Sequence, residues 1–229
     1  MSETEPLTID PLPDRGKHDA WVTILTVIVG SCIVAYLTWY NRRTWIGDEY
    51  LVVNSTYLLF VPVLLIIGGF RESLESFGFA RPEKKSVKHT WKLFFAMLPI
   101  LIIASRFKAF QDTYPLRPVA AVDGSQLLLW ELSYGMYMFS WEFFYRGFLT
   151  FGVSRKLGWW PAIIIQAAAF GMMHYGKPPA EFISSFFGGA ILGWLALKSK
   201  SFLPCFSIHW AISVLMDLLS IHGKPGALF

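Results

Sequence analysis

Charged and imidazole side chains interrupt the apolar stretches in the C-terminal half of this sequence. A charged residue inside a lipid-facing helix costs roughly 2.5–3.5 kcal/mol on insertion scales, so each one needs a partner or a function. Carboxylates and imidazoles that converge in an apolar cavity can activate water, with a buried glutamate as general base. Imidazoles can also bind a metal or stabilise an oxyanion. The residues concerned are Glu131, Glu142, Arg146, His174, Glu181, His209 and Asp217.

Helical spacing places several of these residues on common faces. Glu142 and Arg146 are four residues apart, so an internal ion pair is the simplest explanation for both charges. His209, Ser213 and Asp217 repeat every four residues and form a second polar stripe. Hydrogen bonds between helices would explain each polar residue by itself, but one shared site explains the whole set better.

Other hydrolytic chemistries have weaker support. Neither Cys32 nor Cys205 lies beside a histidine, and both lie in apolar stretches that are typical of core positions. Ser213 is only one turn from His209 on the same expected helix. The sequence contains no glycine-rich phosphate loop and no HExxH zinc motif. Water activation by carboxylates and imidazoles is therefore the chemistry that we favour.

The composition indicates a membrane protein. Of the 229 residues, 54% are hydrophobic and only 16% are charged, whereas soluble domains carry about 25% charged residues. We therefore expect an all-α polytopic membrane bundle of about seven transmembrane helices. Residues 1–20 should form a polar flexible tail and residues 21–229 a single membrane domain, with a motif-bearing core at about 126–220. The expected spans are Trp21–Tyr40, Tyr50–Gly69, Trp91–Ser105, Gln126–Phe151, Trp159–His174, Phe182–Leu197 and Phe202–Ser220.

The charges are distributed as in a membrane protein. The net charge is +4, and the Lys and Arg residues form short clusters between the apolar stretches. A nucleic-acid-binding protein would gather them on one soluble face, so we expect the lipid bilayer and no nucleic acid as a partner. The clusters on the side of the N-terminus are the richer ones, which predicts a cytoplasmic N-terminus.

Residue counts from the two expected hairpin turns, near Lys156 and Lys200, allow the depths of the polar residues to be compared. At 1.5 Å per residue, Glu142, His174 and the later acids lie roughly 21–28 Å from their turns. His209 lies only roughly 13 Å from its turn. A helix tilt or a shifted turn must therefore bring His209 to the level of the others.

Three motifs follow one another at a characteristic spacing. The first is WEFFYRG at residues 141–147, the second runs from Phe170 to His174, and the third is His209 with Ser213 one turn later. Together they resemble the EExxxR, FxxxH and histidine motifs of the CPBP family of intramembrane metalloproteases. That family includes type II CAAX prenyl proteases and Abi-like bacteriocin-processing or self-immunity proteins. The resemblance covers about 126–220.

The resemblance implies site residues, with two departures from the family pattern. Trp141 occupies the first glutamate position, commonly assigned as the catalytic base, as in a bacterial branch with a Trp-Glu form of this motif. Ser213 replaces the usual Asn. Either Glu142 takes over as base from a position about 100° around the helix, or it pairs with Arg146 and another acid supplies the carboxylate. We expect Glu142, His174 and His209 as catalytic residues, and Arg146, Glu181, Ser213 and Asp217 as supporting residues.

The resemblance and the residues together predict an intramembrane endopeptidase in a bacterial plasma membrane. Its substrate would be a membrane-embedded or lipidated protein. A divalent metal such as Zn²⁺ is an open alternative to metal-free chemistry, with His174, His209 and Glu142 as candidate ligands. A non-catalytic bacteriocin self-immunity protein or membrane chaperone is the alternative function. A small transporter has less support because no repeated half is found.

Overall fold

The computed structural model describes residues 9, 15–44, 46–222, 224 and 228. Every regular element in this part of the chain is helical, and most of the predicted tail lies outside it. The α-helices are α1 (Lys17–Asn41), α2 (Asp48–Ser55), α3 (Val61–Leu64), α4 (Lys84–Ala104), α5 (Lys108–Thr113), α6 (Gly124–Glu142), α7 (Thr150–Leu157), α8 (Trp159–Met172), α9 (Pro179–Ser199) and α10 (Leu203–Ile221). Short π-helical segments occupy Thr56–Phe60, Leu65–Gly69 and Phe143–Leu149, and 3-10 turns occupy Leu74–Phe77 and Pro118–Ala121.

The helices confirm a polytopic all-α membrane bundle. Five are long and apolar enough to cross a bilayer: α1, the continuous helix Asp48–Gly69, α4, α9 and α10. The π-helical segment joins α6 to α7 in one continuous helix, and α8 is apolar but shorter. Each of the seven predicted spans coincides with one of these helices. The Asp123 side chain caps α6 by accepting hydrogen bonds from the backbone N–H groups of residues 125 and 126.

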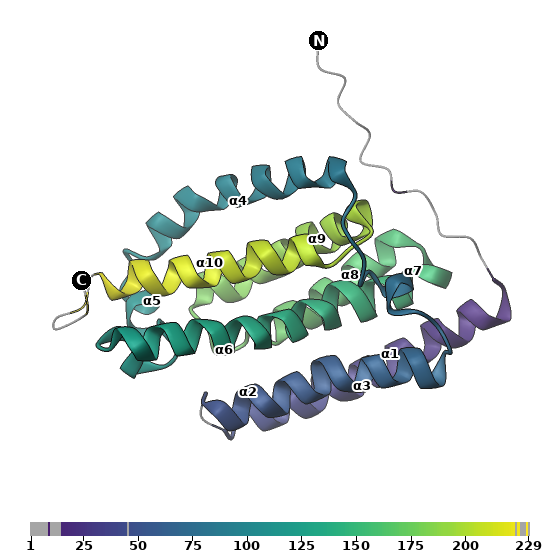
Figure 1. Ribbon diagram of the computed structural model, residues 1–229, viewed down its shortest axis with the longest axis horizontal. Coiled ribbons are helices and arrows are strands. Elements are labelled where there is room, and N and C mark those ends of the chain that lie inside the picture. Colours follow the sequence, from purple (N-terminus) through teal and green to yellow (C-terminus); the bar gives the residue numbers. More distant parts are fainter. Residues whose placement is uncertain (1–8, 10–14, 45, 223, 225–227, 229) are drawn as a thin grey trace, which may run out of the picture.

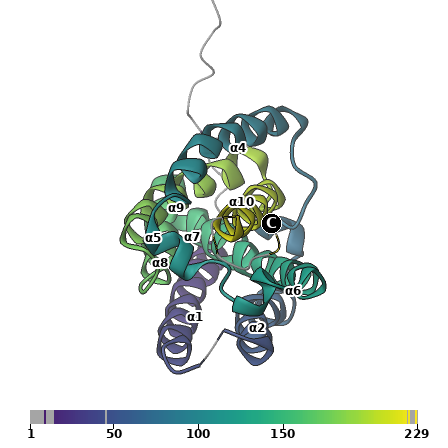
Figure 2. The ribbon, with the colours of Figure 1, turned by 90° about the vertical axis from the view of Figure 1, so that its left-hand side faces the viewer.

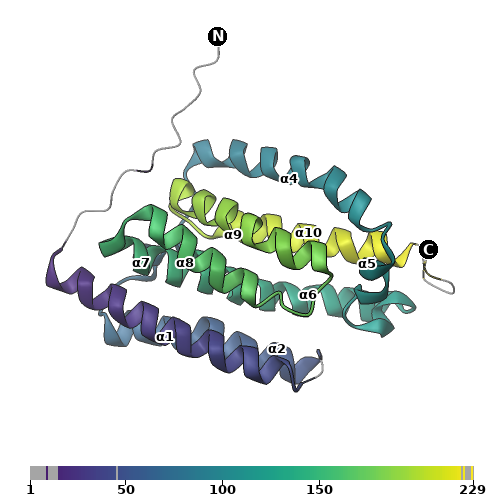
Figure 3. The same cartoon turned by 180° about the vertical axis from the view of Figure 1, so that it is seen from behind.

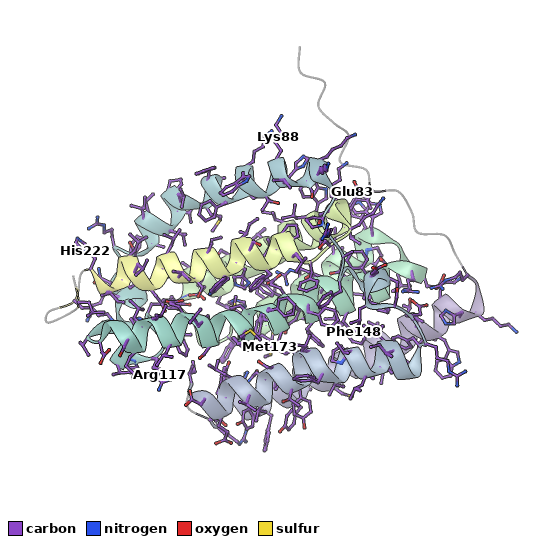
Figure 4. The ribbon with its side chains drawn as sticks, in the orientation of Figure 1. Glu83, Lys88, Arg117, Phe148, Met173 and His222 are labelled. Atoms are coloured by element: carbon purple, nitrogen blue, oxygen red, sulfur yellow. The ribbon has the colours of Figure 1, made fainter. Side chains whose placement is uncertain are left out.

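The helices run side by side in layers (Figure 1). The helix α1 and the 48–69 helix form one outer layer, α6 to α8 lie next to it, α9 and α10 follow, and α4 covers the opposite side. Closely packed pairs are α8 with α9, α1 with α7, and α10 with α4 (Figures 2 and 3). Figure 4 shows Lys88 and His222 at the periphery and Phe148 between layers. The chemistry-bearing helices α6, α8, α9 and α10 therefore form the inner layers.

The π-helical segment 143–149 is the most deeply buried part of the chain. All seven of its residues are buried, and four of them are aromatic. π-helical turns within α-helices often mark functional sites, because the extra residue per turn redirects side chains. Gly147 is required here, since a Cβ atom would lie 2.9 Å from the backbone oxygen of Phe77. The loop around Phe77 thus packs directly against the helix that carries Glu142 and Arg146.

An ionic cluster joins α1, α7 and the loop after residue 70. The Arg155 guanidinium contacts both carboxylate oxygens of Glu72 and lies 3.4 Å from Asp19 Oδ1. The side chains of Asp19 and Arg155 are almost fully buried. Residue spacing could not reveal this cluster, because its members are far apart in the chain.

Replacing Glu72 by Gln should destabilise the protein by about 1–3 kcal/mol, because Arg155 then loses its closest anionic partner. Burial raises the pKa of Glu72, but hydrogen bonds from Arg155 and Ser76 outweigh it, so the pKa lies below its usual range. The stabilisation is therefore present at neutral pH and is lost as the pH falls through this lowered pKa. Thermal unfolding in detergent at pH 7 and at acid pH measures the effect.

The control for this prediction is Glu75→Gln, which removes an exposed carboxylate from the same loop. It should change the unfolding midpoint little at either pH. An equal loss of stability from Glu72→Gln at both pH values would contradict the proposed ionic origin.

Candidate active site

The centre of the site is a contact between Glu142, at the end of α6, and His209 on α10. His209 Nδ1 lies 2.6 Å from Glu142 Oε1, a hydrogen-bond distance. Side chains on a helix lean toward its N-terminus, and α6 and α10 are antiparallel (Figure 1), so the two side chains lean in opposite axial directions. The axial offset between the two helices brings them into contact. Glu142 has no exposed side-chain surface, whereas 19% of the His209 side chain remains exposed.

Arg146 supplies the countercharge for Glu142. Its Nε lies 3.3 Å from Glu142 Oε2, and both side chains are completely buried. The guanidinium carbon lies 3.9 Å from the centre of the Phe170 ring, in a cation–π arrangement. The predicted ion pair is therefore present, although the chain between the two residues is π-helical. Both oxygens of Glu142 face a basic group.

His174 follows the C-terminal end of α8 and lies beside His209. Its Nδ1 lies 2.9 Å from the carbonyl oxygen of Phe170, which can only accept a hydrogen bond. We infer that Nδ1 carries the proton and that Nε2 presents a lone pair when the ring is neutral. The two imidazole rings stack with their centroids 6.4 Å apart. Phe170 contacts both rings and holds them in place.

A cavity of about 540 Å³ lies in front of the two imidazoles. Apolar side chains of α4 form one wall, and residues from α6, α9 and α10 also line the cavity. His174, His209 and Ser213 line it, and so do Glu181 and Trp141. The Trp141 indole and the His174 ring pack nearly perpendicular to each other, at 5.9 Å between centroids. The cavity is thus mostly apolar, and its α4 residues are all apolar.

Other predicted site residues are paired elsewhere. Glu181 Oε1 accepts a 2.6 Å hydrogen bond from the hydroxyl of Tyr114. Asp217 Oδ2 accepts a hydrogen bond from the Trp130 indole at 3.0 Å, and Asp217 is buried without lining the cavity. Neither carboxylate contacts the imidazoles, although Glu181 shares their cavity.

Comparison with known proteins matches part of the chain to a protein family. Residues 124–215 match the type II CAAX prenyl endopeptidase Rce1-like family. No curated protein and no solved structure matches the chain. The matched segment spans α6 to α10 and is less than half of the 229 residues. It therefore contains the helices that carry Glu142, His174 and His209.

The structure brings together only part of the residue set predicted from the sequence. Glu142, Arg146, His174 and His209 form one contiguous cluster, and Ser213 lines the cavity beside it. Residue spacing could not reveal Tyr114 and Lys177 at the cavity wall. Tyr114 comes from outside residues 124–215, and Lys177 lies in a turn between two apolar helices, where lysines are ordinary membrane-flanking charges.

The side chains of the cluster do not fit a three-ligand metal site. Within the described part of the chain, no group of three His, Cys, Asp or Glu side chains is arranged to hold a metal ion. Glu142 cannot serve as a ligand in this arrangement, because its oxygens face His209 and Arg146. The two imidazoles alone fall short of the three protein ligands usual at catalytic zinc sites.

Proposed function

We propose that the protein is an intramembrane endopeptidase that hydrolyses a peptide bond of a membrane-embedded or lipidated protein. The observation that carries this proposal is the Glu142–His209 pair, which places an imidazole at the wall of an apolar cavity with a buried carboxylate behind it. The match of residues 124–215 to Rce1-like endopeptidases supports the same reaction class.

In the proposed reaction, His209 is the general base. Glu142 accepts the hydrogen bond from Nδ1–H, so Nε2 presents its lone pair toward the cavity and takes a proton from water. The water oxygen then bonds to the carbonyl carbon of the scissile peptide. When the C–N bond breaks, the Nε2 proton passes to the leaving amine, which balances the reaction. Glu142 is then a positioning residue and not the base, since it is fully buried.

His174 and Ser213 complete the proposed site beside His209. The lone pair on His174 Nε2 can accept a hydrogen bond from the same water and orient it for attack. The Ser213 hydroxyl lines the cavity and can donate to the developing oxyanion. The apolar α4 wall would receive the hydrophobic part of the substrate and exclude bulk water.

Chelation should leave the proposed activity within about twofold of its original value, because the donor set does not complete a metal site. The measurement is the cleavage rate of purified protein before and after EDTA treatment, with metal content determined in parallel. A loss of activity that Zn²⁺ restores would show that the cluster rearranges to bind a metal.

Comparative membrane proteomics tests the function itself. A strain that lacks the gene and a strain that carries His209→Gln should accumulate the same uncleaved membrane protein. Wild type should contain its shortened form instead. If the deletion has a phenotype that His209→Gln fully complements, the non-catalytic self-immunity or chaperone function is favoured instead.

A further inference from the structure

A second polar group lines the same cavity, in the turn between α8 and α9. The ammonium of Lys177 donates a 3.2 Å hydrogen bond to the hydroxyl of Tyr114 and lies 4.8 Å from the centre of that ring. An ammonium has three N–H donors. Among the residues that the structure describes, Tyr114 is the one hydrogen-bond acceptor of this ammonium. Two donors remain available to a ligand in the cavity.

The positive charge of Lys177 is incompletely compensated. Burial lowers the pKa of Lys177, and this effect outweighs the opposing attraction of the Glu181 and Asp217 carboxylates. The Glu181 carboxylate accepts a hydrogen bond from the Tyr114 hydroxyl, and the same hydroxyl accepts one from the ammonium. The carboxylate therefore contacts Tyr114 and not the ammonium itself. Asp217 is bound by Trp130 and does not line the cavity. An additional anion at Lys177 would therefore be stabilised.

The surroundings of Lys177 define what kind of anion fits. Of the Lys, Arg, Asp and Glu side chains that the structure describes, only Lys177 and Glu181 line the cavity. The α4 wall offers Leu93, Met97 and Ile100 to an apolar chain. The Lys177 backbone N–H donates to the His174 carbonyl oxygen at 3.0 Å, so one turn links this ammonium to the imidazole pair.

We propose that Lys177 forms a subsite for a carboxylate carried by an apolar chain, bound in the same cavity as the imidazoles. The inference rests on the proposed function, in which this carboxylate belongs to the substrate. Tyr114 positions the ammonium and shields it from Glu181. The carboxylate can be a chain terminus, an acidic side chain or the head of a fatty acid, because all three present the same two oxygens.

Binding in lipid nanodiscs tests the subsite without cleavage, in full-length protein that carries His209→Gln. The probes are the apolar peptide acetyl-Leu-Val-Ile-Leu with a free carboxylate, the same peptide as its amide, an amidated peptide that ends in Glu, and dodecanoate. Calorimetry should give about tenfold tighter binding of at least one carboxylate probe than of the uncharged amide. Lys177→Met should abolish this preference, and Glu181→Gln should preserve or increase it.

The matched control is Lys88→Met, which removes an exposed lysine of α4 outside the cavity and should keep the preference. Whichever carboxylate probe shows the Lys177-dependent preference identifies the source of the carboxylate. Equal binding of acid and amide, absence of binding by all probes, or a preference that survives Lys177→Met overturns the subsite. Because His209→Gln does not cleave in the proposed mechanism, such a result leaves the peptidase proposal standing.

Discussion

Replacing His209 by Gln should lower the rate of substrate cleavage by about 10³-fold, because the cavity then lacks its general base. Glu142→Gln should lower it by about 10²- to 10⁴-fold, since the amide can no longer stabilise the imidazolium or fix its tautomer. Both effects should appear in kcat, with KM changed by less than about twofold, because neither change removes the apolar substrate wall. Assays use the purified protein and the substrate found by proteomics.

The chain offers a matched control for the histidine substitution. His89 lies on α4 and packs edge-on against Trp194, outside the cavity lining, so His89→Gln should cleave at nearly the wild-type rate. Size-exclusion profiles should show that all variants are folded. Wild-type kcat in purified Glu142→Gln protein would remove Glu142 from the mechanism, and wild-type kcat in His209→Gln protein would remove the proposed base.

Replacing Arg146 by Met should lower the free energy of unfolding by about 3–5 kcal/mol, because it leaves the Glu142 carboxylate buried beside His209 without its guanidinium partner. Adding Glu142→Gln to Arg146→Met should restore much of the lost stability, since neither of these two positions then carries a buried charge. The double variant should remain inactive. Unfolding midpoints and free energies in detergent measure the coupling between the two positions.

Arg106→Met serves as the control for this cycle. Arg106 is exposed between α4 and α5, and its removal should change stability by no more than about 0.5 kcal/mol. If the two substitutions at 142 and 146 simply add, the ion pair contributes no coupling. The charge balance that we assign to this pair would then be wrong.

Much of the fold follows directly from local sequence properties. Apolar length predicted a helix at each of the seven positions, and five of these helices are long and apolar enough to cross a bilayer. An apolar stretch becomes helical in lipid because a helix satisfies its own backbone hydrogen bonds. Spacing along one helix predicted the Glu142–Arg146 pair. Both inferences concern residues close together in the chain, where helical geometry fixes the distance.

The axial offset between helices could not be predicted from residue counts. Counting residues from the turns near Lys156 and Lys200 assumes that both turns lie at the same depth in the membrane. On that assumption His209 lies too close to its turn to contact Glu142. In the structure, α7 extends beyond the turn between α9 and α10 (Figures 1 and 3). That turn lies beside the middle of the α6–α7 helix, where the rings of Phe202 and Phe143 pack with their centroids 5.4 Å apart. The backbone N–H of Phe202 also donates a hydrogen bond to the carbonyl oxygen of Gly78.

The sequence alone therefore determined a helical membrane protein whose candidate site residues belong to its last four long helical stretches. Those properties depend on composition and on periodicity within each helix. Only the tertiary structure decided that Glu142 lies behind His209, that Asp217 pairs with Trp130, and that Lys177 reaches the cavity. These contacts depend on how far antiparallel helices slide along one another and how they rotate. Aromatic packing between segments that are distant in the chain contributes to both the axial offset and the rotation of the helices. Residue spacing within a single helix contains no information about that packing.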